Sequence, residues 1–463
     1  MKTMQITLCA AVAAFAVHAE PTVSRVVARQ QWPWSTEIRI DYTLENATSP
    51  VDVNLEFKDG DQALSVASGS AAVQGDVYYV GNGVHTITVD PVAAFGTAKP
   101  AFADFKVRVT PTASSVLPDN KVLYKIVDLV ASNVTDVTRS ELLLGKYGTV
   151  VTNYSQIGTG FSTPLTDVVV WTGVTADNAY KTTKLVLRRI PAGMFNMGSP
   201  EGEYGRDTTP ISGAPKLSET QHSVTLTKDY WIGVFPLTQK QYKIITGSDT
   251  VPMSQHGDMT NGDADLNPVY DVTYNDARGS SAGAGWPSSH AVDDSSIIGN
   301  LRSIFNGTIV FDLPTEAQWE KACRGGNEGA NVMFNGKLLY DNETETIQSA
   351  NRNEIIWSSY NSVVDKKLKT QPVGSKPANA YGLYDTVGNV CEWVLDWAGD
   401  FTADAATDPE GPASGKQRVV RGGDVSGNCG TTLALRSAFR FARNVNALYN
   451  GVIPGLRICV TEE

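Results

Sequence analysis

The sequence predicts two parts of different fold class: an all-β amino-terminal domain and a larger domain that mixes strands with a few helices. Three observations lead to this prediction. Apolar and polar residues alternate from Val23 to about Thr110, two helix starts are recognisable after residue 237, and much of the remaining chain is Gly-rich without periodicity. A chain of 463 residues is long enough for two or three domains.

Residues 1–19 resemble a secretory signal peptide, because Lys2 precedes an apolar stretch from Ile6 to Val17 and small residues follow at the cleavage position. The stretch is too short to span a bilayer. We therefore expect an exported protein, periplasmic, secreted or on the cell surface, without a membrane span. The net charge of −11 argues against a nucleic-acid partner, which requires clustered Lys and Arg.

The alternation in residues 20–112 predicts antiparallel strands of a small β-sandwich of immunoglobulin-like type. The clearest run places apolar side chains at Ile38, Ile40, Tyr42 and Leu44. Trp32 and Trp34 are either a pair that stacks on a sugar or buried aromatics that close the edge of the sandwich, and the sequence favours the second interpretation.

A segment rich in Pro, Ser, Ala and Asp ends the sandwich, and residues 113–182 are predicted as a linking β extension. The main domain is predicted for residues 183–463. Two of its helices begin at capping boxes, in which a Thr and a Gln three residues later satisfy exposed amide groups. The pairs are Thr238 with Gln241 and Thr315 with Gln318, and the helices are expected to end at Gly247 and Gly325. On the second helix Cys323 is expected to point inward.

The run from Tyr381 to Trp393 concentrates turn formers, aromatics and two carboxylates. Two interpretations are open. The set Asp385, Gly388, Val390 and Glu392 offers carboxylate and backbone oxygens, which a hard cation such as Ca²⁺ prefers. Alternatively, Asp385 forms an Asx turn and Glu392 caps the start of a helix.

Cysteine use supports export. If Cys9 is removed with the signal peptide, four cysteines remain, and an even number in an exported protein favours disulfides. They are Cys323, Cys391, Cys429 and Cys459.

Seven motifs in series resemble the formylglycine-generating enzyme family, also called sulfatase-modifying factor domains. They lie at Ile190–Ser199, Tyr230–Tyr242, Pro268–Ala277, Leu313–Gly326, Tyr381–Trp393, Arg421–Gly423 and Gly455–Arg457. The resemblance covers about residues 183–461 and implies an α+β fold, related to C-type lectins, with little regular secondary structure.

The resemblance also implies site residues. The family's structural Ca²⁺ motif falls on Asp385, Gly388, Val390 and Glu392, and a second Ca²⁺ site would lie around residues 350–361. A family disulfide corresponds to Cys323 and Cys459, the latter displaced by one residue.

The oxidase chemistry of the family uses O₂ and copper held by two thiolates, which are the ligands that Cu(I) prefers. Counting from Gly423, with Arg436 and Arg440 matched to the family's Arg pair, the copper ligands fall on Gly427 and Thr432, and neither is a thiol. Copper or iron is therefore not expected.

Cys429 lies between those two positions, and Cys391 replaces a Trp that lies near the family's active-site floor. Three interpretations stay open for this pair: a disulfide, two unrelated buried thiols, or a displaced metal or redox pair. A related branch of the family holds nonheme iron through histidines. The histidines outside the signal peptide, His85, His222, His256 and His290, lack any paired spacing.

The sequence thus predicts a calcium-stabilised binding or scaffolding module without formylglycine-generating activity. A peptide or a glycan is the expected ligand, with Arg436, Arg440 and Trp393 as candidate cleft residues. The rival hypothesis is a metal-dependent oxidase that acts on a peptide cysteine or a small thiol. For such an enzyme the candidate catalytic residues are Cys429, Cys391, Arg436 and Arg440.

Overall fold

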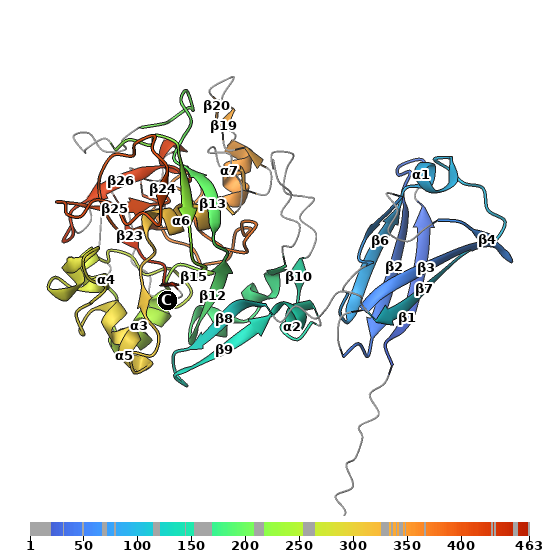
Figure 1. Cartoon of the computed structure of the whole chain (residues 1–463), viewed down its shortest axis with the longest axis horizontal. Coiled ribbons are helices and arrows are strands. Elements are labelled where there is room, and N and C mark those ends of the chain that lie inside the picture. The colour runs from blue at the N-terminus through green and yellow to red at the C-terminus, as the bar shows by residue number, and fades with distance from the viewer. Residues whose placement is uncertain are drawn as a thin grey trace, which may run out of the picture. The chain divides into compact units, whose positions relative to one another are not determined.

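The computed structural model divides the chain into two compact units, which Figure 1 shows in colours running from blue to red. Unit 1 comprises Met1–Asn120 and Leu143–Lys146, and unit 2 comprises Lys121–Leu142 and Tyr147–Glu463. The described residues are 20–30, 32–48, 51–66, 72–77, 80–113, 121–143, 145–151, 169–207, 217–252, 264–325, 333–334, 337–338, 340–341, 346–347, 349–364, 367–426, 429, 432–447 and 452–461. The predicted signal peptide lies outside them.

Unit 1 is built from two antiparallel sheets that share one apolar core. The first sheet has the order β1 (Thr22–Gln30), β2 (Ile38–Glu45), β6 (Gly83–Val89) and β5 (Val73–Gly75). The second has the order β4 (Gln62–Leu64), β3 (Val51–Asp59) and β7 (Phe105–Ala113), and a short helix α1 (Pro91–Phe95) follows β6. The predicted run in β2 is buried at every second residue, as alternation requires. The relation to immunoglobulin domains stays a prediction.

The two tryptophans near the start of unit 1 contradict the favoured interpretation. Trp34 is 88% exposed and Trp32 40% exposed, so neither closes the edge of the sandwich. The loop that carries them is fixed by Gln30, whose side-chain amide donates to the carbonyl oxygens of Thr36 (2.6 Å) and Ala98 (2.7 Å). Because these bonds hold the backbone of the loop, its indole rings face solvent.

The largest sheet of unit 2 has six strands, ordered β16 (Phe311–Asp312), β28 (Cys459–Thr461), β15 (Tyr230–Gly233), β12 (Lys184–Ile190), β8 (Val122–Asp128) and β9 (Asn133–Thr138). All of its strand pairs are antiparallel. Strand β8 pairs directly with β12 along five residues. The boundary expected at residue 183 therefore differs from the compact unit, which already begins at Lys121.

Two smaller sheets carry most of the family motifs. One has the order β26 (Arg440–Arg443), β25 (Arg418–Arg421), β23 (Cys391–Trp397) and β27 (Pro454–Gly455), and the other the order β13 (Gly193–Met197), β14 (His222–Leu226) and β24 (Ala406–Thr407). Four two-stranded pairs complete the strands: β10 (Val150–Val151) with β11 (Val170–Trp171), β17 (Met333–Phe334) with β18 (Lys337–Leu338), β19 (Tyr340–Asp341) with β20 (Thr346–Ile347), and β21 (Val363–Val364) with β22 (Lys367–Leu368).

The described helices of unit 2 are short, as expected for a domain with much irregular chain. They are α2 (Arg139–Leu143), α3 (Gln239–Thr246), α4 (Tyr274–Arg278), α5 (Ile297–Ile304), α6 (Glu316–Arg324) and α7 (Ser349–Ile355), with 3₁₀ turns at η1 (Thr172–Thr175), η2 (Asn178–Lys181), η3 (Ala282–Gly285) and η4 (Thr432–Ala434). Both predicted capping boxes are present, and Gly247 and Gly325 adopt the left-handed conformation at the helix ends. A third box, Thr273 with Asp276, starts α4.

This arrangement of many short strands and few helices agrees with the predicted α+β class. Among the described residues, no helix is long and apolar enough to cross a membrane.

A network of buried ion pairs surrounds α6. Arg421, completely buried, donates from Nη1 to Glu316 (2.8 Å) and from Nη2 to Glu320. Arg440 holds both oxygens of Glu316 (2.6 and 2.7 Å), and Arg324 donates to Glu320 (2.6 Å). The desolvation cost of these charges is offset only because each carboxylate meets two guanidinium groups with good geometry. The network therefore fixes α6 against β25 and β26.

Asp396 is buried beside this network. One of its carboxylate oxygens accepts a hydrogen bond from the backbone amide of Glu316, at 2.7 Å. Burial, and then the charge of Glu316, raise the pKa of Asp396 well above the ordinary value of an aspartate. Burial thus favours the protonated form of Asp396 at neutral pH.

We expect Arg421→Met to lower the free energy of unfolding by about 3 to 5 kcal/mol, because it leaves Glu316 and Glu320 buried with fewer partners. The thermal unfolding midpoint measures this change. The control is Arg39→Met, which removes a pair to Asp41 from a side chain that is 57% exposed, and it should cost less than about 1 kcal/mol. Equal losses in the two variants would contradict this account of the network.

We also expect the stability of the protein to depend on the protonation of Asp396. Above about pH 4 the unfolded chain has lost a proton that the folded protein still holds, so this group makes stability fall as the pH rises. One such proton contributes a slope of about 1.4 kcal/mol per pH unit. Asp396→Asn should therefore gain stability relative to the wild type between pH 5 and pH 8, measured by urea unfolding. A difference that is constant over this range would contradict the shift.

Candidate binding site

The turn of residues 381–390 leads into β23 and is fixed by backbone contacts. Asp385 has a φ of 52°, and Gly388 a φ of 82°. A Cβ atom on Gly388 would lie 2.2 Å from the carbonyl oxygen of Trp357, so no other residue fits this position. The amide of Gly388 donates to the carbonyl oxygen of Gly422, at 2.8 Å. The turn thereby joins two segments that are distant in sequence.

The two carboxylates of this turn have different environments. Asp385 accepts a hydrogen bond from the amide of Gly374 (2.7 Å), and burial raises its pKa to about 6. Glu392 is fully engaged: Arg457 donates to it from Nη2 (2.7 Å) and Nε (3.0 Å), and Trp319 from Nε1 (2.7 Å). Asp385 is thus the carboxylate with the weaker compensation of its charge.

This geometry bears on the predicted calcium ligands. The carboxylate of Asp385 and the backbone oxygens of Gly388 and Val390 are of the chemical type that suits Ca²⁺. Glu392 fits the set less well, since a cation would compete with Arg457 for its oxygens. Among the described residues, no three His, Cys, Asp or Glu side chains converge as a metal-binding group. The calcium site stays a prediction.

The scattered histidines do not converge in the part of the chain that is described. His85 packs on Tyr42, His222 on Phe401 and His290 on Trp286. His256 lies outside the described residues.

Cys391 and Cys429 are free thiols that share one buried cluster with Asp424. The thiol of Cys391 hydrogen-bonds to the carboxylate of Asp424, and the amide of Asp424 donates to the carbonyl oxygen of Cys429 (3.1 Å). Burial, and then the Asp424 carboxylate, raise the pKa of both thiols well above the ordinary value. In this structure no disulfide joins the pair, and both are free thiols in one buried cluster. The matched copper positions, Gly427 and the side chain of Thr432, lie outside the described residues.

The predicted cleft residues are not in a cleft. Arg436 and Trp393 are completely buried, and Arg440 is 4% exposed. Arg436 holds both oxygens of Glu219 at 2.8 Å, and the indole of Trp393 donates to the carbonyl oxygen of Val272. The prediction was wrong because each of these polar groups has its partner inside the domain.

The predicted disulfide between Cys323 and Cys459 is also absent, since both are free thiols. Cys323 lies on α6 against the carbonyl oxygen of Thr386, whereas Cys459 lies on β28 against Gln318. The two thiols therefore lie on different elements and have different partners.

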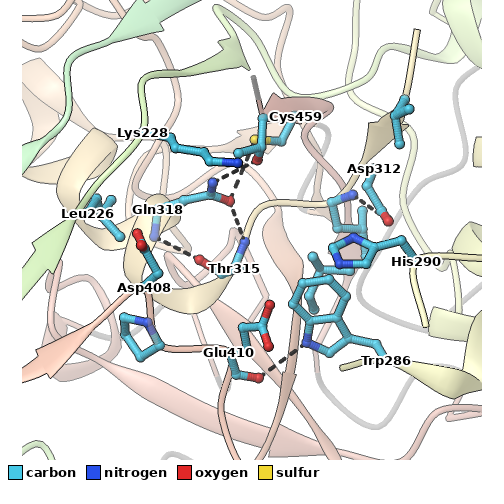
Figure 2. A pocket seen from close by; sticks show the side chains of 15 residues that line it. Leu226, Lys228, Trp286, His290, Asp312, Thr315, Gln318, Asp408, Glu410 and Cys459 are labelled. Atoms are coloured by element: carbon cyan, nitrogen blue, oxygen red, sulfur yellow. Dashed lines mark hydrogen bonds between the residues drawn. The ribbon is translucent and has the colours of Figure 1, made fainter. Parts of the chain in front are cut away.

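Cys459 instead lines the cavity shown in Figure 2, which has a volume of about 500 Å³. Six segments form its walls: the end of β14, the chain from Trp286 to His290, the chain from Val310 through β16 to the start of α6, Leu395 of β23, the chain after β24, and β28. The lining residues are Leu226, Lys228, Trp286, His290, Val310, Asp312, Leu313, Thr315, Gln318, Leu395, Asp408, Pro409, Glu410, Cys459 and Thr461.

Several polar groups of the cavity are already satisfied by the protein. Asp312 pairs with Arg278 (2.7 Å) and Arg302 (3.3 Å). The carboxylate of Asp408 accepts from the amide and hydroxyl of Thr227. These groups shape the wall without demanding a ligand.

Three titratable side chains of the cavity are not satisfied by the protein in this way. No hydrogen bond or ion pair joins the charged or ring atoms of Lys228, His290 and Glu410 to any described residue. In Figure 2 Lys228 lies beside Cys459 and Gln318, and Glu410 lies on the other side of the cavity, next to Trp286. The cation of Lys228 and the anion of Glu410 are thus both available to a ligand.

The local backbone explains the position of Glu410. Strand β24 runs parallel to β14, and Asp408 turns the chain after it with a φ of 43°. The indole of Trp286 donates to the carbonyl oxygen of Glu410, at 3.2 Å. Gly411 follows with a φ of 75°. A Cβ atom at this position would lie 2.9 Å from the Cβ atom of Asp396.

Sequence reasoning missed this cavity. The sequence marks His290 only as an isolated histidine, and it gives no signal for Lys228, Trp286 or Glu410, because their neighbours in the cavity come from distant segments.

Comparisons with known proteins agree with the predicted family. The model of the sulfatase-modifying factor enzyme 1-like domain matches residues 174–459. Formylglycine-generating enzyme of Mus musculus is 40% identical over 116 residues, which cover 24% of this chain and 29% of that protein. The enzyme of Streptomyces coelicolor is 38% identical over 117 residues, which cover 24% of this chain and 35% of that protein.

The matched stretch therefore spans about a third of the length of these two enzymes. Among solved structures, Treponema denticola variable protein 1 is similar with a TM-score of 0.44 and 23% identity, covering 60% of this chain and 96% of that one. Because the family model matches more than half of the 463 residues, the chain belongs to the sulfatase-modifying factor enzyme 1-like domain family.

Proposed function

We propose that this protein is an exported binding module of its family, without formylglycine-generating activity. The observation that carries the proposal is the cavity of Figure 2, where the charged or ring atoms of Lys228, His290 and Glu410 line an open site and form no hydrogen bond or ion pair with a described residue. Pockets of a few hundred Å³ with an apolar floor and a few polar groups are typical ligand sites.

The thiols support the non-catalytic part of the proposal. Copper needs thiolates as ligands, and the two cysteines nearest to the matched positions are 1% exposed. Burial and Asp424 favour the protonated form of Cys391 and Cys429. Buried thiols in the protonated form are poor nucleophiles.

We further propose that structural Ca²⁺ stabilises the turn through Asp385, with Gly388 and Val390 supplying backbone oxygens. The buried carboxylate of Asp385 has little compensation from the protein, as its raised pKa indicates. A bound cation would offset this cost.

We expect no oxidation of a cysteine-containing sulfatase-type peptide when the protein is incubated with Cu(I) and O₂. Mass spectrometry of the peptide measures the outcome, with formylglycine-generating enzyme of Mus musculus as the positive control. Cys391 and Cys429 should also resist alkylation until the protein is unfolded. Conversion of the peptide that disappears in Cys429→Ala would contradict the proposal and favour the rival oxidase.

We expect chelation of Ca²⁺ to lower the melting temperature of the wild type. Asp385→Asn should have a lower melting temperature in calcium and show no further change on chelation. The control is Asp404→Asn, which changes an exposed aspartate and should keep the response to the chelator. A wild-type transition that is the same with and without Ca²⁺ would count against the calcium site.

A further inference from the structure

We propose that the cavity of Figure 2 binds a short peptide with free termini and an apolar body, held by its two opposite charges. The ammonium group would pair with Glu410 and the carboxylate with Lys228. This inference rests on the proposed binding function and names its ligand class.

The charges of the cavity lead to this ligand. Asp312 is neutralised by two arginines, and Asp408 is satisfied by Thr227. The charges that remain for a ligand are the cation of Lys228 and the anion of Glu410. A ligand that carries one charge of each sign meets both, whereas a purely anionic ligand would be repelled by Glu410 and a purely cationic one by Lys228.

The backbone places these two side chains after neighbouring strands of one sheet, without pairing them with each other. Lys228 follows β14 and Glu410 follows β24, and the two strands form a parallel pair whose ends are joined by the contacts of Thr227 with Asp408. Glu410 is additionally held by the hydrogen bond from Trp286 to its carbonyl oxygen. Because the protein does not bring the two charges together, a ligand can lie between them.

The space between the charges suits an apolar body. Leucine and valine side chains line it, and Trp286, which is 3% exposed, provides an aromatic surface. Thr315 and Gln318 bond to each other: the backbone amide of Thr315 donates to the side-chain oxygen of Gln318, and the backbone amide of Gln318 donates to the hydroxyl of Thr315. This middle part of the wall therefore offers mainly apolar contact.

A neutral glycan fits the same wall less well. It carries no charge that could pair with the exposed side chains of Lys228 and Glu410. A zwitterionic peptide can pair with both.

Calorimetry on the mature chain, residues 20–463, tests the proposal with a mixture of free dipeptides composed of Leu, Val and Phe, and then with the dipeptide Val-Leu. Free Val-Leu should bind, and N-acetylation or C-amidation should each weaken binding by roughly fivefold or more. In Glu410→Gln the effect of N-acetylation should disappear while that of C-amidation remains. Lys228→Met should give the reverse pattern.

Two control variants, Glu56→Gln and Lys58→Met, change exposed charges of unit 1 and should bind as the wild type does. Thermal unfolding of each variant separates lost binding from lost folding. No heat from the dipeptide mixture at millimolar concentration, or binding that ignores both blocked termini, would overturn the proposal. Binding of cellobiose in place of the dipeptides would also overturn it, while leaving a binding function without oxidase activity intact.

Discussion

The buried ion pairs around α6 are the constraint on which the rest of unit 2 depends. Glu316 and Glu320 receive guanidinium groups from β25 and β26, and Glu320 also accepts the amide of Gly198 at 2.7 Å. Such pairs add little net stability, because desolvation opposes the attraction. Their main effect is to fix the position of α6, because any displacement of this helix leaves a charge unpaired. In a domain with short elements, this requirement fixes the arrangement that apolar contacts alone would leave loosely defined.

The same helix connects this network with the cavity. Its first residues point in two directions, with Glu316 facing the arginines while Thr315 and Gln318 line the cavity. The side chain of Asp396 accepts the amide of Glu316, and the neighbouring Leu395 lines the cavity. A cavity wall that is built on residues fixed by buried charges is rigid, and rigidity lowers the conformational entropy lost when a ligand binds. The network therefore supports binding without contacting the ligand.

Local signals in the sequence predicted local structure well. The capping boxes at Thr238 and Thr315 depend on residues three positions apart, and the alternation in β2 depends on neighbours in one strand. The prediction that Arg436 lies in a cleft was wrong because its partner is distant in the sequence. Its partner Glu219 is 217 residues away, and an arginine without a visible partner is normally expected at the surface. The cavity escaped prediction because six segments that are distant in the sequence build it, and each supplies only a few of its polar residues.

Cys459 connects the cavity wall with α6 through non-covalent contacts. It begins β28 and lies against Gln318, whereas Cys323 lies against the carbonyl oxygen of Thr386. Burial raises the pKa of Cys459 far above its ordinary value, so the thiol contributes contact area and not reactivity. The link to α6 that a disulfide would have made then depends on non-covalent contacts, among them the hydrogen bond between Gln318 and Thr461 at 2.9 Å. Without a disulfide, this wall of the cavity thus depends on the non-covalent packing of β28 against α6.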